Sequence, residues 1–301
     1  MQTLALRRQA PPGLARRHEL ADVPFFPQTE HHCGPAALAT VLRHIGLDVS
    51  PAQLAEPLYL PARTGTLQVE MLAGARRQGS VATRIPPTLD AALREVQAGH
   101  PVLVLQNLGL SWAPLWHYAV LVGHDLDRGE VLLRSGTTRR EVLAMSTFEH
   151  TWQRSGGWAF VALPPGDWPG TAQEAAVVEA AVGHERVAPP RVAVLVYRSA
   201  LQRWPANLSL AMGLGNSLHA AGDLGAAAQA FEAAADRHDS AAAWVNLAST
   251  RLDQGQADAA LQAAQRAVGR KDPAFAVAAA EVLARARTAL ARPGASPIVP
   301  R

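Results

Sequence analysis

The sequence predicts two domains of different fold class: an α+β domain with an antiparallel sheet, and an all-α domain of helical repeats. Three observations lead to this prediction. Predicted helices, followed by a series of short strands, fill residues 21–166. The Pro- and Gly-rich stretch PPGDWPG then indicates a linker, which we place at 167–173. Beyond it, residues 174–291 are rich in alanine and show an internal repeat of 33 or 34 residues.

The composition excludes several classes of protein. The formal net charge is only +3 and no dense basic run with interleaved aromatic residues occurs, so no nucleic-acid partner is expected. The single cysteine, Cys33, excludes an internal disulfide framework and a multi-cysteine zinc site. No G-x4-GK[ST] run is present, so the sequence carries no Walker-type nucleotide-binding motif.

The two ends of the chain are expected to lack regular structure. Residues 1–20 combine arginines with proline and glycine, which predicts a flexible arm, and residues 292–301 predict a disordered tail. The arm lacks the run of about 7–15 apolar residues typical of a secretory signal. No window of about 18 apolar residues predicts a transmembrane helix. As written, the chain is therefore expected to be cytoplasmic, and a translation start further upstream would change this expectation.

The stretch 24–45, PFFPQTEHHCGPAALATVLRHI, predicts a helix that begins at or just after Cys33. Four apolar residues recur at the i, i+3, i+4, i+7 spacing of one helix face: Leu38, Val41, Leu42 and Ile45. Pro35 suits the first turn, where a missing N–H costs nothing. The unpaired N–H groups and the dipole at this end of a helix favour a thiolate over a thiol.

The remaining elements of the first domain follow in order. Capping residues and apolar periodicity predict further helices at 50–58, 66–79 and 88–99. Extended or apolar runs predict strands at 80–86, 102–106, 117–123, 130–134, 140–145 and 158–165. A short helix capped by Ser146 is expected at 146–157. The tight turn LDRGE joins the strands 117–123 and 130–134 into a hairpin.

The alanine-rich segment carries the repeat in three registers. Residues recur at spacings of 34 and then 33: Tyr197, Phe231 and Ala264; Ala200, Ala234 and Ala267; Ala193, Ala227 and Ala260. Small residues at helix contacts and a turn glycine, Gly222, matched by Gly255, resemble about three tetratricopeptide repeats over 174–273, with 274–291 as a capping helix. The first repeat departs from this pattern, since Ala188 stands where the other repeats have the turn glycine. Chance agreement in an alanine-rich segment is the alternative. The resemblance implies a protein or peptide partner.

Cysteine-based hydrolysis needs a thiolate, an imidazole, a group that orients the imidazole, and donors for the oxyanion. Cys33 can supply the thiolate. Gln28 lies five residues earlier, from where its amide can donate to the oxyanion beside the N–H of Cys33. His117 begins the most apolar strand. The orienting group is expected on the paired strand, VLLRSG, at 130–136.

These residues resemble a known family. The motif Gln28-x4-Cys33-Gly34-Pro35-Ala36-Ala37, followed about 80 residues later by His117-Tyr118-Ala119-Val120, is similar to the bacteriocin-processing, double-glycine leader cysteine peptidases and their stand-alone relatives. The resemblance covers roughly 20–165 and implies a papain-like fold and a peptide or protein substrate, without a cofactor. It also implies Cys33 as nucleophile, His117 as general base and acid, and Gln28 as oxyanion donor.

One position departs from the family pattern. The family usually has Asp on the strand after the His strand, where this chain has Arg134-Ser135-Gly136. Ser135 aligns best with the orienting residue. Its hydroxyl can accept from the imidazole N–H and fix the tautomer, but it does not stabilise imidazolium as a carboxylate does. Two alternatives to hydrolysis therefore stay open: a non-catalytic peptide-binding scaffold, and acyl transfer to an amine.

Other candidate residues have simpler interpretations. His31 and His32 flank the cysteine, but adjacent side chains in an extended segment point to opposite sides, so no metal site is expected. Trp112 and Trp116 suit either the wall of a groove or plain packing. Trp152 and Trp158 are expected in the core.

Overall fold

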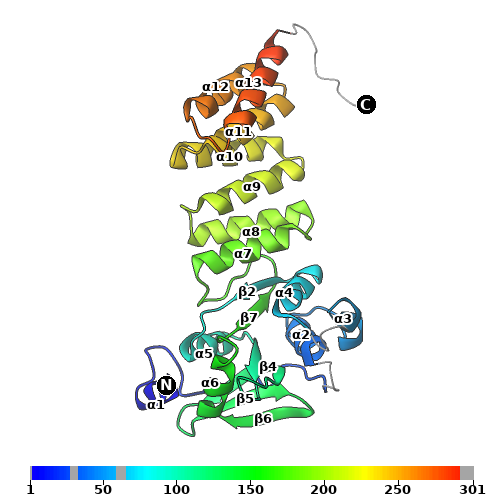
Figure 1. The fold of residues 1–301 in the computed structure, drawn as a ribbon, viewed down its shortest axis with the longest axis vertical. Helices are drawn as coiled ribbons and strands as arrows, with labels where there is room; N and C mark the ends of the chain where they lie inside the picture. The colour runs from blue at the N-terminus through cyan, green and yellow to red at the C-terminus, as the bar shows by residue number, and fades with distance from the viewer. Residues whose placement is uncertain (1, 28–32, 59–65, 292–301) are drawn as a thin grey trace. The chain divides into compact units, whose positions relative to one another are not determined.

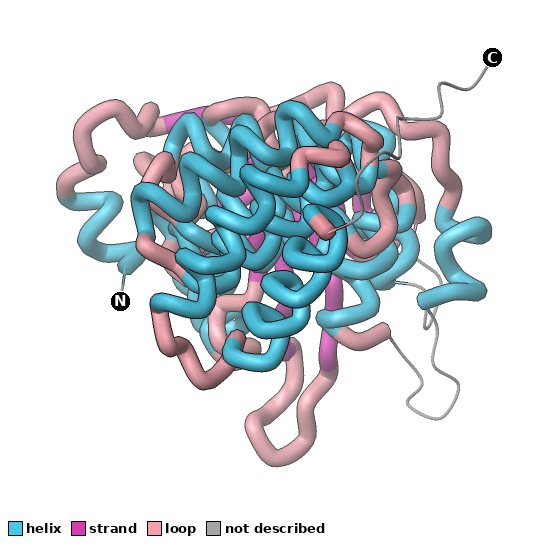
Figure 2. Tube along the Cα trace, turned by 90° about the horizontal axis from the view of Figure 1, so that it is seen from above, coloured by secondary structure: helices cyan, strands magenta, loops and turns pink. Residues whose placement is uncertain are grey.

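The computed structural model describes residues 2–27, 33–58 and 66–291, and for Pro57 and Leu58 only the backbone (Figures 1 and 2). Gln28, the pair His31 and His32, and the expected tail at 292–301 lie outside the described residues. The chain divides into two compact units, Met1–Ala188 and Pro189–Arg301.

The first unit is built on a sheet in which the described residues form seven strands. Its neighbouring strands follow the order β2-β7-β3-β4-β5-β6, and β1 pairs with β4, all antiparallel. The strands are β1 Arg17–Glu19, β2 Val81–Arg84, β3 Val102–Asn107, β4 Trp116–Asp125, β5 Glu130–Ser135, β6 Thr138–Ala144 and β7 Ala159–Leu163. The helices are α1 Gln2–Arg8, α2 Cys33–His44, α3 Pro51–Leu58, α4 Gln68–Arg77, α5 Leu89–Gln97, α6 Met145–Gln153 and α7 Glu174–Glu185. The predicted α+β class is confirmed.

Two cores lie on opposite faces of this sheet. Successive residues of a strand point to opposite faces. On β4, Tyr118 joins a buried cluster that includes Leu38 of α2, whereas the next residue, Ala119, joins a cluster that includes Leu93 of α5. The helix that begins at Cys33 therefore covers one face, and α5 and α6 cover the other.

The N-terminal segment is ordered, so the expected flexible arm over residues 1–20 was wrong. The carboxylate of Glu149 in α6 accepts hydrogen bonds from the backbone N–H of Gln2 at 2.6 Å and of Thr3 at 2.9 Å. A carboxylate at a helix N-terminus satisfies free N–H groups and interacts favourably with the dipole. Leu6 and Leu14 are buried in the second core. The composition of the segment predicts disorder because it does not take account of these few residues that hold the segment in place.

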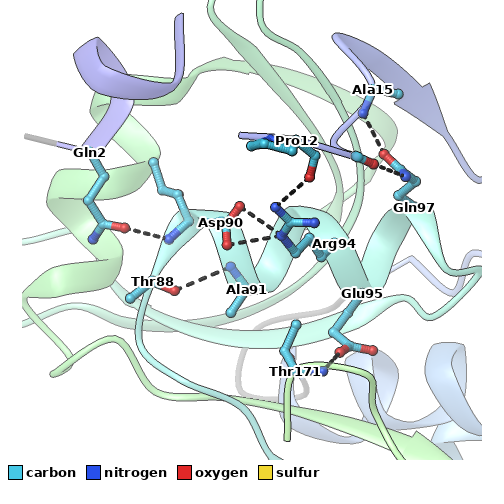
Figure 3. Close-up of polar contacts among 12 residues, drawn as sticks. Gln2, Pro12, Ala15, Thr88, Asp90, Ala91, Arg94, Glu95, Gln97 and Thr171 are labelled. Carbon is cyan, nitrogen blue, oxygen red and sulfur yellow. Dashed lines mark hydrogen bonds and ion pairs between the residues drawn. The ribbon is translucent and has the colours of Figure 1, made fainter. Parts of the chain in front are cut away.

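Helix α5 fastens distant segments to the first unit (Figure 3). Thr88 caps its N-terminus through a side-chain hydrogen bond, as the sequence predicts. At its other end, the side-chain oxygen of Gln97 accepts from the backbone N–H of Ala15 at 2.6 Å. The buried carboxylate of Glu95 accepts from the N–H of Thr171 at 2.6 Å. Both the N-terminal segment and the connection before α7 are therefore held in place.

The division between the units lies after α7, beyond the linker expected at 167–173. Helix α7 packs on β2 and α4. Gly183 leaves room for a guanidinium from α4, since a Cβ there would lie 2.3 Å from Nη1 of Arg76. The Nδ1 of His184 lies 3.2 Å from the carbonyl oxygen of Ser80. These contacts assign α7 to the first unit, which corrects the expectation that the helical repeat domain begins at residue 174.

In its described part, the second unit contains only helices. They are α8 Pro190–Arg203, α9 Leu208–Ala220, α10 Leu224–His238, α11 Ala241–Asp253, α12 Ala257–Gly269 and α13 Ala276–Leu290. Consecutive helices of this unit pack against one another. A Cβ at Gly215 of α9 would lie 2.4 Å from the ring of Phe231 in α10, and one at Gly213 would lie 2.2 Å from the ring of Tyr197 in α8. Small residues therefore occur where helices touch, and the predicted all-α class is confirmed.

Candidate active site

Cys33 is the first residue of α2, as the sequence predicts. Its half-buried side chain packs against the core cluster on the α2 face of the sheet. The residues that follow it, Gly34 and Pro35, are buried. A Cβ at Gly34 would lie 2.9 Å from Oγ1 of Thr66 and 3.3 Å from Sδ of Met71, closer than ordinary contacts. The start of α2 therefore fits only because residue 34 has no side chain.

His117 and Ser135 form a hydrogen-bonded pair at the ends of neighbouring strands. His117 is the second residue of β4 and Ser135 the last residue of β5. The imidazole Nε2 and the hydroxyl Oγ are 2.9 Å apart, and Ser135 is only 8% exposed. Gly136 follows with a φ of +56°, in the left-handed region that favours glycine, so β5 turns directly into β6. The structure thus brings together the imidazole and the hydroxyl that the sequence paired.

Burial governs the charge of His117. Removal from water disfavours the imidazolium and lowers the pKa of His117 below its usual value of 6.5, while the negative charge of Glu141 on β6 acts in the opposite direction. Burial is the larger effect, so the ring is neutral at neutral pH. With Nε2 engaged by Ser135, Nδ1 has no hydrogen-bond partner among the described residues. A neutral ring with one free nitrogen is suited to act as a general base.

Tyr118, the residue after His117, connects the cysteine with the sheet. Burial raises the pKa of the Tyr118 hydroxyl, and a negative charge on Cys33 raises it further, so the two side chains lie within electrostatic range. The hydroxyl donates to the backbone carbonyl of Thr66 at 3.1 Å. The ring lies edge-on to Trp158, with centroids 5.9 Å apart. The sequence motif contains Tyr118, but no spacing rule assigns it this position.

The predicted site residues differ in how closely the structure brings them together. His117 and Ser135 are in contact, and Cys33 lies near the residue adjoining His117. In the described part of the chain, no hydrogen bond joins Cys33 to His117. Gln28 lies outside the described residues, so its role as oxyanion donor stays a prediction.

The tryptophans divide into two groups. Trp152 and Trp158 are 0% and 5% exposed, so the prediction that they belong to the core is confirmed. Trp112, in the loop between β3 and β4, is 81% exposed, and Trp116, the first residue of β4, is 51% exposed. This exposure excludes core packing for these two, and their predicted role as groove walls stays a prediction.

No group of three or more His, Cys, Asp and Glu side chains among residues 2–27, 33–58 and 66–291 is placed to hold a metal ion. Within the same residues, no helix is both long and apolar enough to cross a membrane.

Comparison with known proteins finds matches to the first unit. Residues 20–160 match the model of the Peptidase C39 like family. A protein of Methanothermobacter thermautotrophicus, named only as uncharacterized, is 29% identical over 117 residues, 38% of this chain and 75% of that protein. A solved putative C39-like peptidase from Bacillus anthracis is 18% identical, with a TM-score of 0.43, and the match covers 49% of this chain and 97% of that one. The peptidase domain of Streptococcus ComA, a bifunctional ABC transporter of a quorum-sensing pathway, is 23% identical with a TM-score of 0.40, over 47% of this chain and 98% of that one.

The first unit therefore has the papain-like α+β fold of the C39-like peptidases. The family resemblance drawn from the Cys33 and His117 motifs is confirmed at this level.

Proposed function

We propose that this chain is a cysteine peptidase that hydrolyses peptide bonds in a peptide or protein substrate, without a cofactor. Cys33 is the nucleophile, His117 is the general base and acid, and Ser135 orients the imidazole. Gln28 and the N–H of Cys33 stabilise the oxyanion. The family match of residues 20–160 supports this function. The observation that carries it is the hydrogen bond of 2.9 Å between His117 Nε2 and Ser135 Oγ, because it leaves Nδ1 for the thiol.

The proposed reaction has two steps. In the first, the proton of the Cys33 thiol moves to Nδ1 of His117, and the thiolate attacks the carbonyl carbon. The C–N bond then breaks as the imidazolium gives that proton to the leaving amine. In the second step, His117 takes a proton from water, the hydroxide attacks the thioester, and the sulfur leaves and recovers the proton. Throughout, Nε2–H donates to Ser135, which keeps the tautomer fixed.

Alkylation of Cys33 by iodoacetamide tests the proposed Cys33–His117 pair. Alkylation is expected to be fast near neutral pH in the wild type and slower in His117→Ala, because the neutral imidazole accepts the thiol proton and the imidazolium that forms stabilises the thiolate. Cleavage of a peptide library is expected to disappear in Cys33→Ser, with an unchanged far-UV circular dichroism spectrum. Equal alkylation rates in the wild type and His117→Ala would overturn the proposed pair. The product masses separate hydrolysis from transfer to an amine.

One observation favours a second candidate, a peptide-binding scaffold without catalysis. Ser135 is neutral where the family usually has Asp, and replacing the triad carboxylate of a serine protease lowers the rate by about 10⁴-fold. A scaffold would bind peptides with equal affinity before and after Cys33→Ala and would cleave none of them. Cleavage by the wild type that is lost in Cys33→Ala excludes this candidate.

We propose that the second unit consists of tetratricopeptide-type repeats that bind a protein or peptide partner. The glycines at its helix contacts support this proposal, because such repeats need small residues there. Gly215→Leu would separate α9 from α10. It is expected to raise KM for a protein substrate while leaving KM for a short peptide unchanged. Equal KM values for the protein substrate in the wild type and the variant would contradict partner binding by this unit.

A further inference from the structure

The hydrogen bond between His117 and Ser135 raises a question about charge. When His117 takes a proton at Nδ1, it becomes an imidazolium whose Nε2–H donates to the Ser135 hydroxyl. A hydroxyl oxygen is a neutral acceptor and carries no charge that balances the imidazolium. A negative charge from another residue, in addition to the Cys33 thiolate, would further favour the protonated ring.

The pairing of β5 with β6 places one carboxylate on the same face of the sheet as Ser135. Ser135 pairs with Thr138, and Leu133 pairs with Glu141. Leu133 and Ser135 are two residues apart on β5, so both point to one face, and the residues opposite them share that face. Glu141 therefore lies on the face of Ser135, one step along the strand.

A β-bulge produces this arrangement. The register shifts between Leu133 and Ser135, because β6 advances by one residue more than β5 over the same stretch. The extra residue lies between Thr138 and Glu141. Without it, Arg140 would stand opposite Leu133 in place of Glu141. With it, the Arg140 guanidinium instead binds the carboxylate of Glu19, at 2.8 and 2.9 Å.

We propose that Glu141 is a positioning residue for His117 and supplies, from the edge strand β6, the negative charge that Ser135 lacks. This inference rests on the proposed peptidase function. Ser135 fixes the imidazole by a hydrogen bond, and Glu141 stabilises its protonated form through space. The Asp that the family usually has at this position both orients the imidazole and stabilises its charge. In this chain the two roles are divided between Ser135 and Glu141, on neighbouring strands.

The surroundings of Glu141 leave its charge available. Glu141 is half-buried and makes no ion pair within the described part of the chain. Other charged or titratable side chains lie on β6 and on the elements packed against it, β5 and α6: Arg139 and Arg140 on β6, Glu130 and Arg134 on β5, and Glu149 and His150 on α6. Most of these have partners: Arg140 binds Glu19, Glu130 binds Arg128, Arg134 binds backbone carbonyls, Glu149 binds Gln2 and Thr3, and His150 binds Arg154. Among the described residues, Glu141 is the one whose negative charge raises the pKa of His117.

The test compares two substitutions on the same hairpin. Glu141→Gln removes the charge and keeps the shape of the side chain, and Glu130→Gln is the matched control. The NMR resonance of the His117 imidazole is assigned as the one that is absent from the spectrum of His117→Gln. Its pH titration is then followed in each full-length variant. Cys33 alkylation by iodoacetamide is measured over the same pH range. Glu141→Gln is expected to lower the pKa of His117 by about half a unit to one unit, and the alkylation rate by about three- to tenfold. Glu130→Gln is expected to change neither.

A second set of variants, which carry Ser135→Asp, distinguishes a specific electrostatic role of Glu141 from a merely structural one. In Ser135→Asp, a carboxylate contacts the imidazole directly, so adding Glu141→Gln is expected to change the alkylation rate by less than about twofold. Glu141→Ala repeats the test with a different side chain if the glutamine variant fails to fold. An unchanged His117 pKa in Glu141→Gln would overturn the inference, as would an equal effect of Glu141→Gln with Ser and with Asp at position 135. If the pKa moves but the wild type cleaves no peptide, the role of Glu141 holds and the proposed peptidase function fails.

Discussion

Gly34 offers a direct test of how the start of α2 fits against the rest of the site. In Gly34→Ala, the added Cβ would lie 2.9 Å from Oγ1 and 3.0 Å from Cβ of Thr66, and 3.3 Å from Sδ of Met71. Thr66 must therefore move away. Its carbonyl accepts the hydrogen bond from Tyr118, at 3.1 Å, so the displacement reaches the residue next to His117.

The magnitude follows from three terms. Forcing a methyl group into a packed site costs about 1–3 kcal/mol. Loss of the hydrogen bond between Tyr118 and Thr66 adds about 0.5–1.5 kcal/mol. Alanine is the better helix former by about 1 kcal/mol, which offsets part of the loss. The free energy of unfolding of the first unit is therefore expected to fall by about 0.5–3.5 kcal/mol, which lowers Tm by about 1–14 °C in a domain of this size.

Differential scanning calorimetry of the full chain measures this change. Gly225→Ala, in α10, is the control, because the nearest atom to its Cβ would be 3.8 Å away and no loss of stability is expected. Adding Thr66→Ala to Gly34→Ala removes the closest atom, Oγ1, and is expected to recover part of the loss. A wild-type Tm in Gly34→Ala would refute the packing argument.

Three further predictions concern the rest of the chain. Gly215→Ala places a Cβ 2.4 Å from the Phe231 ring and is expected to destabilise the second unit by about 1–3 kcal/mol in thermal unfolding; a rise in Tm would contradict it. Glu149→Ala removes the carboxylate that binds the N-terminus of α1, so proteolysis before residue 17 is expected to be faster, and an unchanged cleavage pattern would exclude this anchoring role. Burial lowers the pKa of His124 and of His184 below 6.5, so the unfolded chain binds protons first as the pH falls. The free energy of unfolding is therefore expected to decrease below about pH 6.5, and equal urea midpoints at about pH 7.5 and pH 5.5 would contradict it.

Local signals in the sequence were enough to predict most of the first unit. The apolar runs at 102–106, 117–123 and 130–134 appear as β3, β4 and β5, because apolar length and turn residues specify a strand without knowledge of its neighbours. One boundary was wrong. Helix α6 begins at Met145 after Ala144, so Ser146 lies inside the helix and is not its cap.

The features that the sequence did not predict depend on contacts between distant segments. The order of the N-terminal segment requires Glu149, which lies 147 residues from Gln2 in the sequence. The place of α7 in the first unit depends on the fit of Arg76 against Gly183. The position of Glu141 depends on a one-residue bulge in β6, and the alternation of side chains along a strand does not reveal a bulge.

The bulge also gives a physical reason for serine at position 135. Ser135 is 8% exposed, so an aspartate there would be almost completely buried, at a cost that its contact with His117 must offset. With Glu141 on the same face of the sheet, that aspartate would also be repelled by a second carboxylate, and one of the two would tend to bind a proton. A neutral hydroxyl at 135 avoids this repulsion and still holds the imidazole at 2.9 Å. Ser135 and Glu141 are therefore best understood as a pair. Ser135→Asp is expected to increase alkylation of Cys33 less when Glu141 is retained than in the Glu141→Gln background, and equal increases in the two backgrounds would show that the two positions act independently.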